Sequence, residues 1–229
     1  MPVVPSQDRS FDRADQRALR SVALQFFVNG ALFASFVPRL PEIRDRVGIS
    51  VAGIGLLMSL AGLASLAGSA VAGPAIARYG TRWVMLGAGT AVSLCLPLVG
   101  VATTPAVLLV GLVGMLTFDV LVDIAMNMQG SWLSARRHAP VMNRLHGLWS
   151  LGTVVGGLLS ARLAAAGVSL PAHRWVAAAG LVAVLLVVGG GVRRVEEHRQ
   201  PVGAPGTGGG QRPGRGGGGS ALFCLGGGG

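Results

Sequence analysis

Residues 105–137 form an apolar stretch long enough to cross a lipid bilayer, yet two aspartates, Asp119 and Asp123, lie near its middle. Residues four apart share one face of an α-helix, and Asn127 continues that face by another turn. A carboxylate at bilayer depth costs about 2.5–3.5 kcal/mol on insertion scales, so this face has to look into a protein interior or a wet cavity. The stretch therefore predicts a membrane-spanning helix with a candidate functional site. The alternative is that both aspartates only form hydrogen bonds between packed helices.

The composition is that of a membrane protein. Of the 229 residues, 51% are apolar and 12% are charged, whereas ordinary soluble domains have about 25% charged residues. At about 20 residues per span, the apolar part has room for about six helices. We therefore expect an all-α membrane protein with six transmembrane helices in residues 21–192, embedded in a lipid bilayer.

Six apolar stretches define the expected spans: 21–37, 49–77, 83–101, 105–137, 147–166 and 175–192. A charged loop with a helical turn is expected at 39–48, a tight basic turn at 78–82 and a basic loop at 135–144. The second span is rich in small residues, and Gly152 and Gly156 have GxxxG spacing in the fifth, which predicts close helix packing. Trp132, Trp149 and Trp175 lie near span ends and are expected to anchor the helices at the membrane interface.

The segments outside the spans differ from them in composition. Residues 1–20 alternate acidic and basic side chains, and we expect a cytoplasmic segment that ends as a short surface helix. Residues 193–229 form a charged run and a Gly-rich tail, which cannot build a core and is expected to be disordered. Such a tail is typical of a frame-shifted or prematurely ended coding sequence, or of a natural low-complexity segment.

The net charge of +10 comes from 19 basic residues, all of them arginines. They cluster between the spans, which fits membrane topology better than binding to nucleic acid, and we expect no nucleic-acid partner. Most lie in the amino-terminal segment and after the second, fourth and sixth spans, so both ends are expected in the cytoplasm. No metal cluster, nucleophile–base set or phosphate-binding loop is present in the sequence. It therefore predicts no enzyme, no catalytic residue, no metal and no cofactor.

Three parts of the sequence resemble the major facilitator superfamily. Six spans with a basic turn after the second are similar to one half of such a transporter, and that turn matches the superfamily's loop signature at Gly73, Arg78, Gly80 and Arg82. The stretches DIAMN (123–127) and HGLWSLG (146–152), together with FFVNGALFASFVPRLPEI in the first span, resemble the bacterial fucose-permease-like branch. The resemblance covers roughly residues 26–192 and implies the amino-terminal six-helix half, in a bacterial inner (plasma) membrane.

This resemblance implies a proton-coupled symporter for a small polar solute such as a sugar. In that branch an acidic residue four positions before an asparagine of the fourth helix is tied to proton coupling, and this position is Asp123 here. Asp119, one turn away, is close enough to titrate together with it. The implied gating loop has Ala77 where the signature has an aspartate, so the charge-relay role of that aspartate is missing and the arginines can serve topology alone.

The resemblance also implies a set of substrate-binding residues near the middle of the membrane. These are polar side chains inside or at the mouth of apolar spans: Asn127, Asn29, Gln25 and His146. For Gln25 and Asn29, hydrogen bonds between helices are the alternative. For His146, whose imidazole can titrate near neutral pH, the alternative is packing at the interface.

Transporters of this superfamily have two six-helix halves with the solute path between them. One half alone leaves the polar face of its first and fourth spans toward lipid, so we expect a second six-helix half or a second copy as partner. A non-transporting membrane fragment or scaffold is the main alternative. A drug exporter is a third, and the fifth span lacks the proline-bearing glycine motif that is associated with drug antiporters.

Overall fold

The computed structural model describes residues 11–192, and all regular elements in this range are helical. In chain order they are α1 (Arg13–Ala34), the 3-10 turn η1 (Val37–Arg39), α2 (Leu40–Val47), α3 (Val51–Val101), α4 (Pro105–Arg137), α5 (Val141–Ala165) and α6 (Leu170–Gly191). Five helical stretches in the described range are long and apolar enough to cross a bilayer, with α1 to α2 counted as one. The expected all-α membrane architecture is confirmed, but six separate spanning helices are not. The expected tail, residues 193–229, and half of the expected amino-terminal segment lie outside the described residues.

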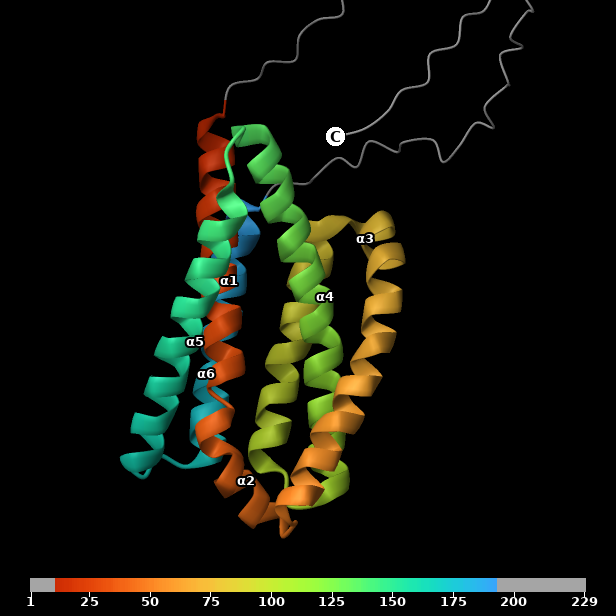
Figure 1. The fold of residues 1–229 in the computed structure, drawn as a ribbon, viewed down its shortest axis with the longest axis vertical. Helices are drawn as coiled ribbons and strands as arrows, with labels where there is room; N and C mark the ends of the chain where they lie inside the picture. Colours follow the sequence, from red (N-terminus) through yellow and green to blue (C-terminus); the bar gives the residue numbers. More distant parts are fainter. Residues whose placement is uncertain (1–10, 193–229) are drawn as a thin grey trace, which may run out of the picture. The chain divides into compact units, whose positions relative to one another are not determined.

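The 51-residue helix α3 bends back on itself at Gly80, whose φ of 80° and ψ of 155° are not helical. Figure 1 shows the two arms of α3 running in opposite directions from the bend. The arms, 51–79 and 81–101, each reach the roughly 20 residues that one crossing needs. Glycine adopts this backbone conformation because it has no Cβ atom to clash. The tight turn expected at 78–82 is present and centred on Gly80, but it is shorter than predicted because only this residue leaves the helical conformation.

Two helices begin earlier than hydropathy predicted. Helix α5 begins at Val141 instead of 147, so the expected basic loop shrinks to the residues around His138. Helix α6 begins at Leu170 instead of 175, because Ser169 accepts a hydrogen bond from the backbone of Ala172 and a proline lies in the first turn. Helix α4 occupies the predicted range, with Thr104 as its cap.

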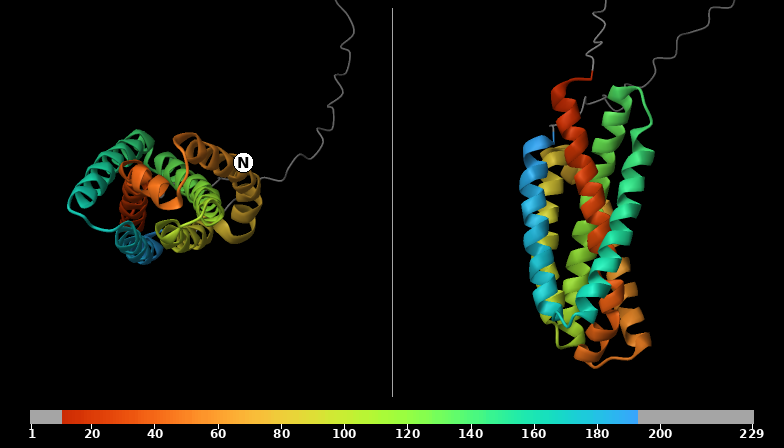
Figure 2. Two further views of the ribbon diagram at one scale, coloured as in Figure 1. Left: turned by 90° about the horizontal axis from the view of Figure 1, so that it is seen from below. Right: turned by 90° about the vertical axis from the view of Figure 1, so that its left-hand side faces the viewer.

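The helices pack in two groups. Helix α1 packs against α5 and α6, the arms of α3 pack against α4, and contacts between α3 and α6 join the groups. The end-on view in Figure 2 shows this division, with α1, α5 and α6 on one side. The closest approach joins α1 and α5, where a Cβ atom on Gly152 or Gly156 would overlap backbone atoms of Phe27 or Ala31. The GxxxG packing predicted for the fifth span is confirmed.

The small residues of the first arm of α3 behave differently. A Cβ atom on Gly68 would meet the carbonyl oxygen of Thr117 on α4 at 2.7 Å, so this glycine does permit a close helix approach. By contrast, Gly55, Gly62 and Gly73 have nothing within 4 Å of such an atom. Most of this glycine-rich face is thus unused for packing among the described helices.

Candidate functional site

The polar faces of α1, α4 and α5 meet at Asn29. Its Nδ2 amide donates to Asp119 Oδ1 at 2.7 Å, and the Nε1–H of Trp149 donates to Asn29 Oδ1 at 2.9 Å. Asn29 is buried, and both ends of its amide are paired, as buried amides require. The interface role expected for Trp149 is wrong, because its indole nitrogen bonds inside the helix bundle.

Asp123 and Asn127 continue the polar stripe of α4 that begins with Asp119. The Nδ2 amide of Asn127 donates to the Asp123 carbonyl oxygen at 2.9 Å and to its Oδ1 at 3.2 Å. Asp123 is exposed in the described chain, whereas Asp119 is half-buried. Neither carboxylate belongs to any of the ion pairs found between residues 11 and 192. Their hydrogen-bond donors there are neutral amides.

A cavity of about 340 Å³ opens beside this network. Its size falls within the range of about 300–1,000 Å³ that small-molecule sites occupy. It brings together five of the six predicted proton-coupling and substrate-binding residues, on three helices: Asn29, Asp119, Asp123, Asn127 and His146. Its apolar wall consists of Phe26, Phe33, Met126 and Trp149. The cavity thus combines apolar side chains with a few convergent polar groups, as small-molecule sites do.

A second hollow of about 600 Å³ shares Asp123 and Asn127 with the first and continues along α4 to Ser131 and Trp132. Ser131 lies four residues after Asn127, so it extends the same helical stripe by one more turn. Sequence reasoning missed Ser131, although the spacing alone could have found it. Thr81 also lines this hollow, and its hydroxyl oxygen accepts a 2.5 Å hydrogen bond from Gln129.

Two of the predicted substrate-binding residues have packing contacts. His146 lines the 340 Å³ cavity, but its Nδ1 bonds to the Met142 carbonyl oxygen at 3.0 Å and its ring meets the Phe26 ring edge-on. Donation to that carbonyl requires the proton on Nδ1, which leaves Nε2 as the acceptor of the neutral ring. Gln25 is buried and lines neither hollow, and its Oε1 has no hydrogen-bond partner among the described residues.

The residues of the implied gating loop lie at the bend of α3. The guanidinium groups of Arg78 and Arg82 lie over the rings of Tyr79 and Trp83, each 5.5 Å from the ring centroid. Gly80 supplies the reversal, as described above, and Gly73 lies in the first arm. None of the four lines either hollow.

These features define a multi-pass helical membrane protein with a polar cavity between three of its helices. Residues 22–223 match the model of the Major Facilitator Superfamily, and the chain belongs to that family. This is a family of membrane transporters, and its members are generally not enzymes. The fucose-permease-like branch stays a prediction.

Three curated relatives are similar to this chain. They are an uncharacterised MFS-type transporter of Yersinia pestis, 33% identical over 136 residues, the uncharacterised transporter y4wD of Sinorhizobium fredii, 27% over 137 residues, and the membrane protein MosC of Rhizobium meliloti, 25% over 138 residues. The matches cover 59%, 60% and 60% of this chain and 35%, 36% and 34% of the relatives. The chain thus spans about a third of the length of the curated relatives it matches. No solved structure matches it.

Proposed function

We propose that the chain is a six-helix half of a proton-coupled transporter, a symporter for a small hydroxyl-rich solute such as a sugar, of the fucose-permease-like branch. The observation that carries this proposal is the shared cavity of Asp119 and Asp123, in which both carboxylates have neutral donors among the described residues. A carboxyl group without a cationic partner favours its neutral form in a closed apolar cavity and its charged form in water. A carboxyl group that alternates between a closed apolar cavity and water therefore takes up and releases a proton.

The two aspartates have different parts in this scheme. Asp123 is exposed and lines both hollows, so it is the group that exchanges its proton with water. Asp119 accepts a hydrogen bond from Asn29 of α1, so its protonation depends on the position of that helix. Asn29, Asn127 and His146 offer hydrogen bonds to the hydroxyl groups of the solute. We assign Gln25 to helix packing, because it lines neither hollow.

A second six-helix unit, from a longer polypeptide or from a second copy, completes the solute path in this proposal. The support is an exposed carboxylate, Asp123, on a mostly apolar helix, and the glycine face of α3 with open space beside it. An exposed carboxylate toward lipid is costly, and small residues permit close helix approach. The curated relatives are long enough to hold two such units.

Six crossings follow when the two arms of α3 are counted separately. We propose that the protein resides in the plasma membrane of a bacterium with both ends in the cytoplasm. The bend of α3, with Arg78 and Arg82, then lies on the cytoplasmic side, where positive charge is favoured and where it can act as a gate.

Proton flux in liposomes tests this function. The chain is purified together with the second six-helix unit, as the longer polypeptide or as a dimer, and reconstituted with a pH-sensitive dye inside the liposomes, and sugars, polyols and other polar solutes are added outside. We expect at least one solute to drive proton entry, and Asp123→Asn to abolish that flux. Asp45→Asn is the matched control, since Asp45 is an exposed residue of α2 whose ion pair within residues 11–192 is with its neighbour Arg44. Absence of flux with all solutes, or undiminished flux in Asp123→Asn, contradicts the proposal and favours a non-transporting scaffold.

A further inference from the structure

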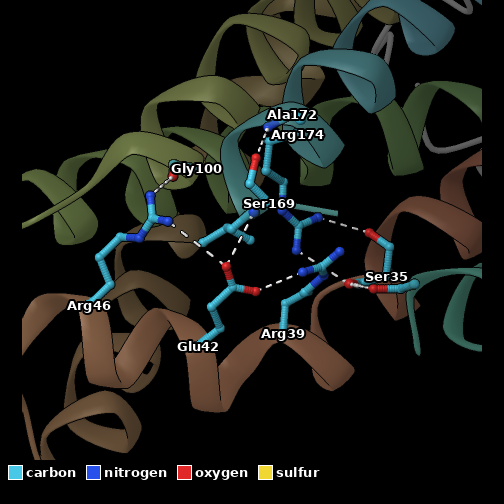
Figure 3. Close-up of polar contacts among 10 residues, drawn as sticks. Ser35, Arg39, Glu42, Arg46, Gly100, Ser169, Ala172 and Arg174 are labelled. Atoms are coloured by element: carbon cyan, nitrogen blue, oxygen red, sulfur yellow. Dashed lines mark hydrogen bonds and ion pairs between the residues drawn. The ribbon is translucent and has the colours of Figure 1, made fainter. Parts of the chain in front are cut away.

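A second group of buried charges lies where the carboxyl end of α1 meets η1, α2 and α6 (Figure 3). Arg39 and Arg174 are the two largest fully buried side chains of the described range, with exposed fractions of 2% and 0%. Arg174 donates to the hydroxyl and the carbonyl oxygen of Ser35 at 2.9 and 3.3 Å, and its guanidinium lies 4.0 Å from the ring centroid of Phe36. All of these partners are neutral.

Glu42 is the carboxylate of this group. It pairs with Arg39 at 2.7 Å and with Arg46 at 3.8 Å, and it accepts a 3.2 Å hydrogen bond from the backbone of Leu170 at the start of α6. Two arginines thus share one carboxylate, and Arg174 forms no ion pair within residues 11–192. Buried charges in proteins are normally paired, so this excess of positive charge calls for an anion.

Within residues 11–192, unpaired nitrogen atoms in this group also call for an anion. Arg39 Nε and Nη2, Arg174 Nε and His173 Nδ1 are buried without a hydrogen-bond partner in the described part of the chain. His173 itself is 7% exposed. Buried donors are nearly always satisfied, by protein, water or ligand.

An apolar groove of about 280 Å³ between α1, α5 and α6 reaches this group, because Ser35 and His173 are part of its lining. The rest of the lining is aliphatic or glycine, and Leu159 and Val176 in it are 55% and 71% exposed. In a bilayer, exposed aliphatic side chains contact lipid acyl chains. The groove thus connects an aliphatic surface, which suits an acyl chain, with a buried basic group. Basic pockets between membrane helices hold anionic lipid headgroups in a similar way.

We propose that this groove binds an anionic phospholipid, with one acyl chain along its aliphatic wall and the phosphodiester at Ser35 and His173, beside Arg174 and Arg39. The phosphate accepts a hydrogen bond from His173, in the tautomer that carries the proton on Nδ1, since the Ser35 hydroxyl already donates to the Leu32 carbonyl oxygen. It also supplies the negative charge that the arginines lack. The groove shares no lining residue with the 340 Å³ cavity, so lipid binding does not depend on the transport function proposed above.

Two glycines of α6 provide a matched pair of variants. Gly180 lines the groove, and a Cβ atom there meets nothing within 4 Å, so Gly180→Leu adds a bulky side chain at the groove from an open position. Gly190 has the same open space but does not line the groove. Gly190→Leu therefore controls for an added leucine on the same helix.

Native mass spectrometry of the full chain in detergent, titrated with phosphatidylglycerol, phosphatidylcholine or inorganic phosphate, tests the proposal. We expect phosphatidylglycerol to bind about tenfold or more tightly than phosphatidylcholine, because its headgroup carries the net negative charge that offsets the excess of arginines. Gly180→Leu should weaken phosphatidylglycerol binding about tenfold, and Gly190→Leu less than about twofold. His173→Ala should reduce the preference for the anionic lipid and keep the binding of both. Equal binding of the two lipids, wild-type binding by Gly180→Leu, or inorganic phosphate that binds as tightly as phosphatidylglycerol would overturn it.

Discussion

The amide of Asn29 on α1 donates a 2.7 Å hydrogen bond to the carboxylate of Asp119 on α4, 90 positions further along the chain. A carboxyl oxygen can accept such a bond whether the group is ionised or protonated. The contact can therefore persist while Asp119 gains or loses a proton. Trp149 of α5 donates to the same amide, so the Asn29 side chain links Asp119 of α4 to both α1 and α5.

A double-mutant cycle measures this contact. Asn29→Ala, Asp119→Ala and the double variant are compared by their free energies of unfolding in detergent. We expect a coupling energy of about 0.5–2 kcal/mol, since hydrogen bonds between membrane helices fall in this range. Single effects that add within about 0.3 kcal/mol would show that the two side chains do not interact.

Close packing of α5 on α1 makes Gly156 sensitive to substitution. A Cβ atom there would overlap the backbone of Ala31, whereas at Gly147 of the same helix it meets nothing within 4 Å. Gly156→Ala should lower the free energy of unfolding by about 1–3 kcal/mol. Gly147→Ala should be neutral or stabilising by up to about 1 kcal/mol, because alanine favours the helix. Equal stabilities of the two variants in thermal unfolding would argue against the packing described here.

The reversal of α3 depends on Gly80, whose φ is 80°. Gly80→Ala forces a Cβ atom into this conformation and should cost about 1–3 kcal/mol of stability. Gly87→Ala is the control, because Gly87 is helical and has open space around its Cα atom. It should be neutral or gain up to about 1 kcal/mol in the same unfolding assay. A Gly80→Ala protein as stable as Gly87→Ala would place the break of α3 elsewhere.

An ion pair links the start of α1 to the end of α4. Arg136 donates from Nε and Nη2 to Asp15 Oδ2 at 3.1 and 2.7 Å, and Asp15 is fully buried. Arg136→Gln removes two charge-assisted hydrogen bonds from a buried carboxylate and should destabilise the fold by about 1.5–3 kcal/mol in chemical denaturation. The exposed neighbour Arg137 gives the control, and Arg137→Gln should change stability by less than about 0.5 kcal/mol. A similar, small effect of both substitutions would mean that the pair is not formed.

Local patterns in the sequence were sufficient to predict part of this molecule. The range of α4 follows from its apolar length and its cap, and the stripe of Asp119, Asp123 and Asn127 follows from the helical repeat. The GxxxG spacing of Gly152 and Gly156 correctly predicted a close helix contact. Each of these signals lies within a few turns of one helix.

Contacts between distant residues could not be predicted in this way. Asp15 and Arg136 are 121 positions apart, and Ser35 and Arg174 are 139 apart, so no periodicity connects them. Sequence reasoning assigned these arginines to membrane topology, although their partners show a structural role. Trp149 was misassigned for the same reason, because only the fold brings it to Asn29.

Water access to the stripe on α4 is the property on which proton coupling most directly depends. Cys95 and Cys224 are first replaced by alanine, and Asn127→Cys is compared with Val154→Cys, on an apolar, exposed position of α5, in liposomes treated with a hydrophilic maleimide. Because maleimide reacts with the thiolate, which forms in water and not in hydrocarbon, Asn127→Cys should react about tenfold or more faster. Equal or slower labelling at position 127 would show that the stripe is closed to water and would contradict its role in proton coupling.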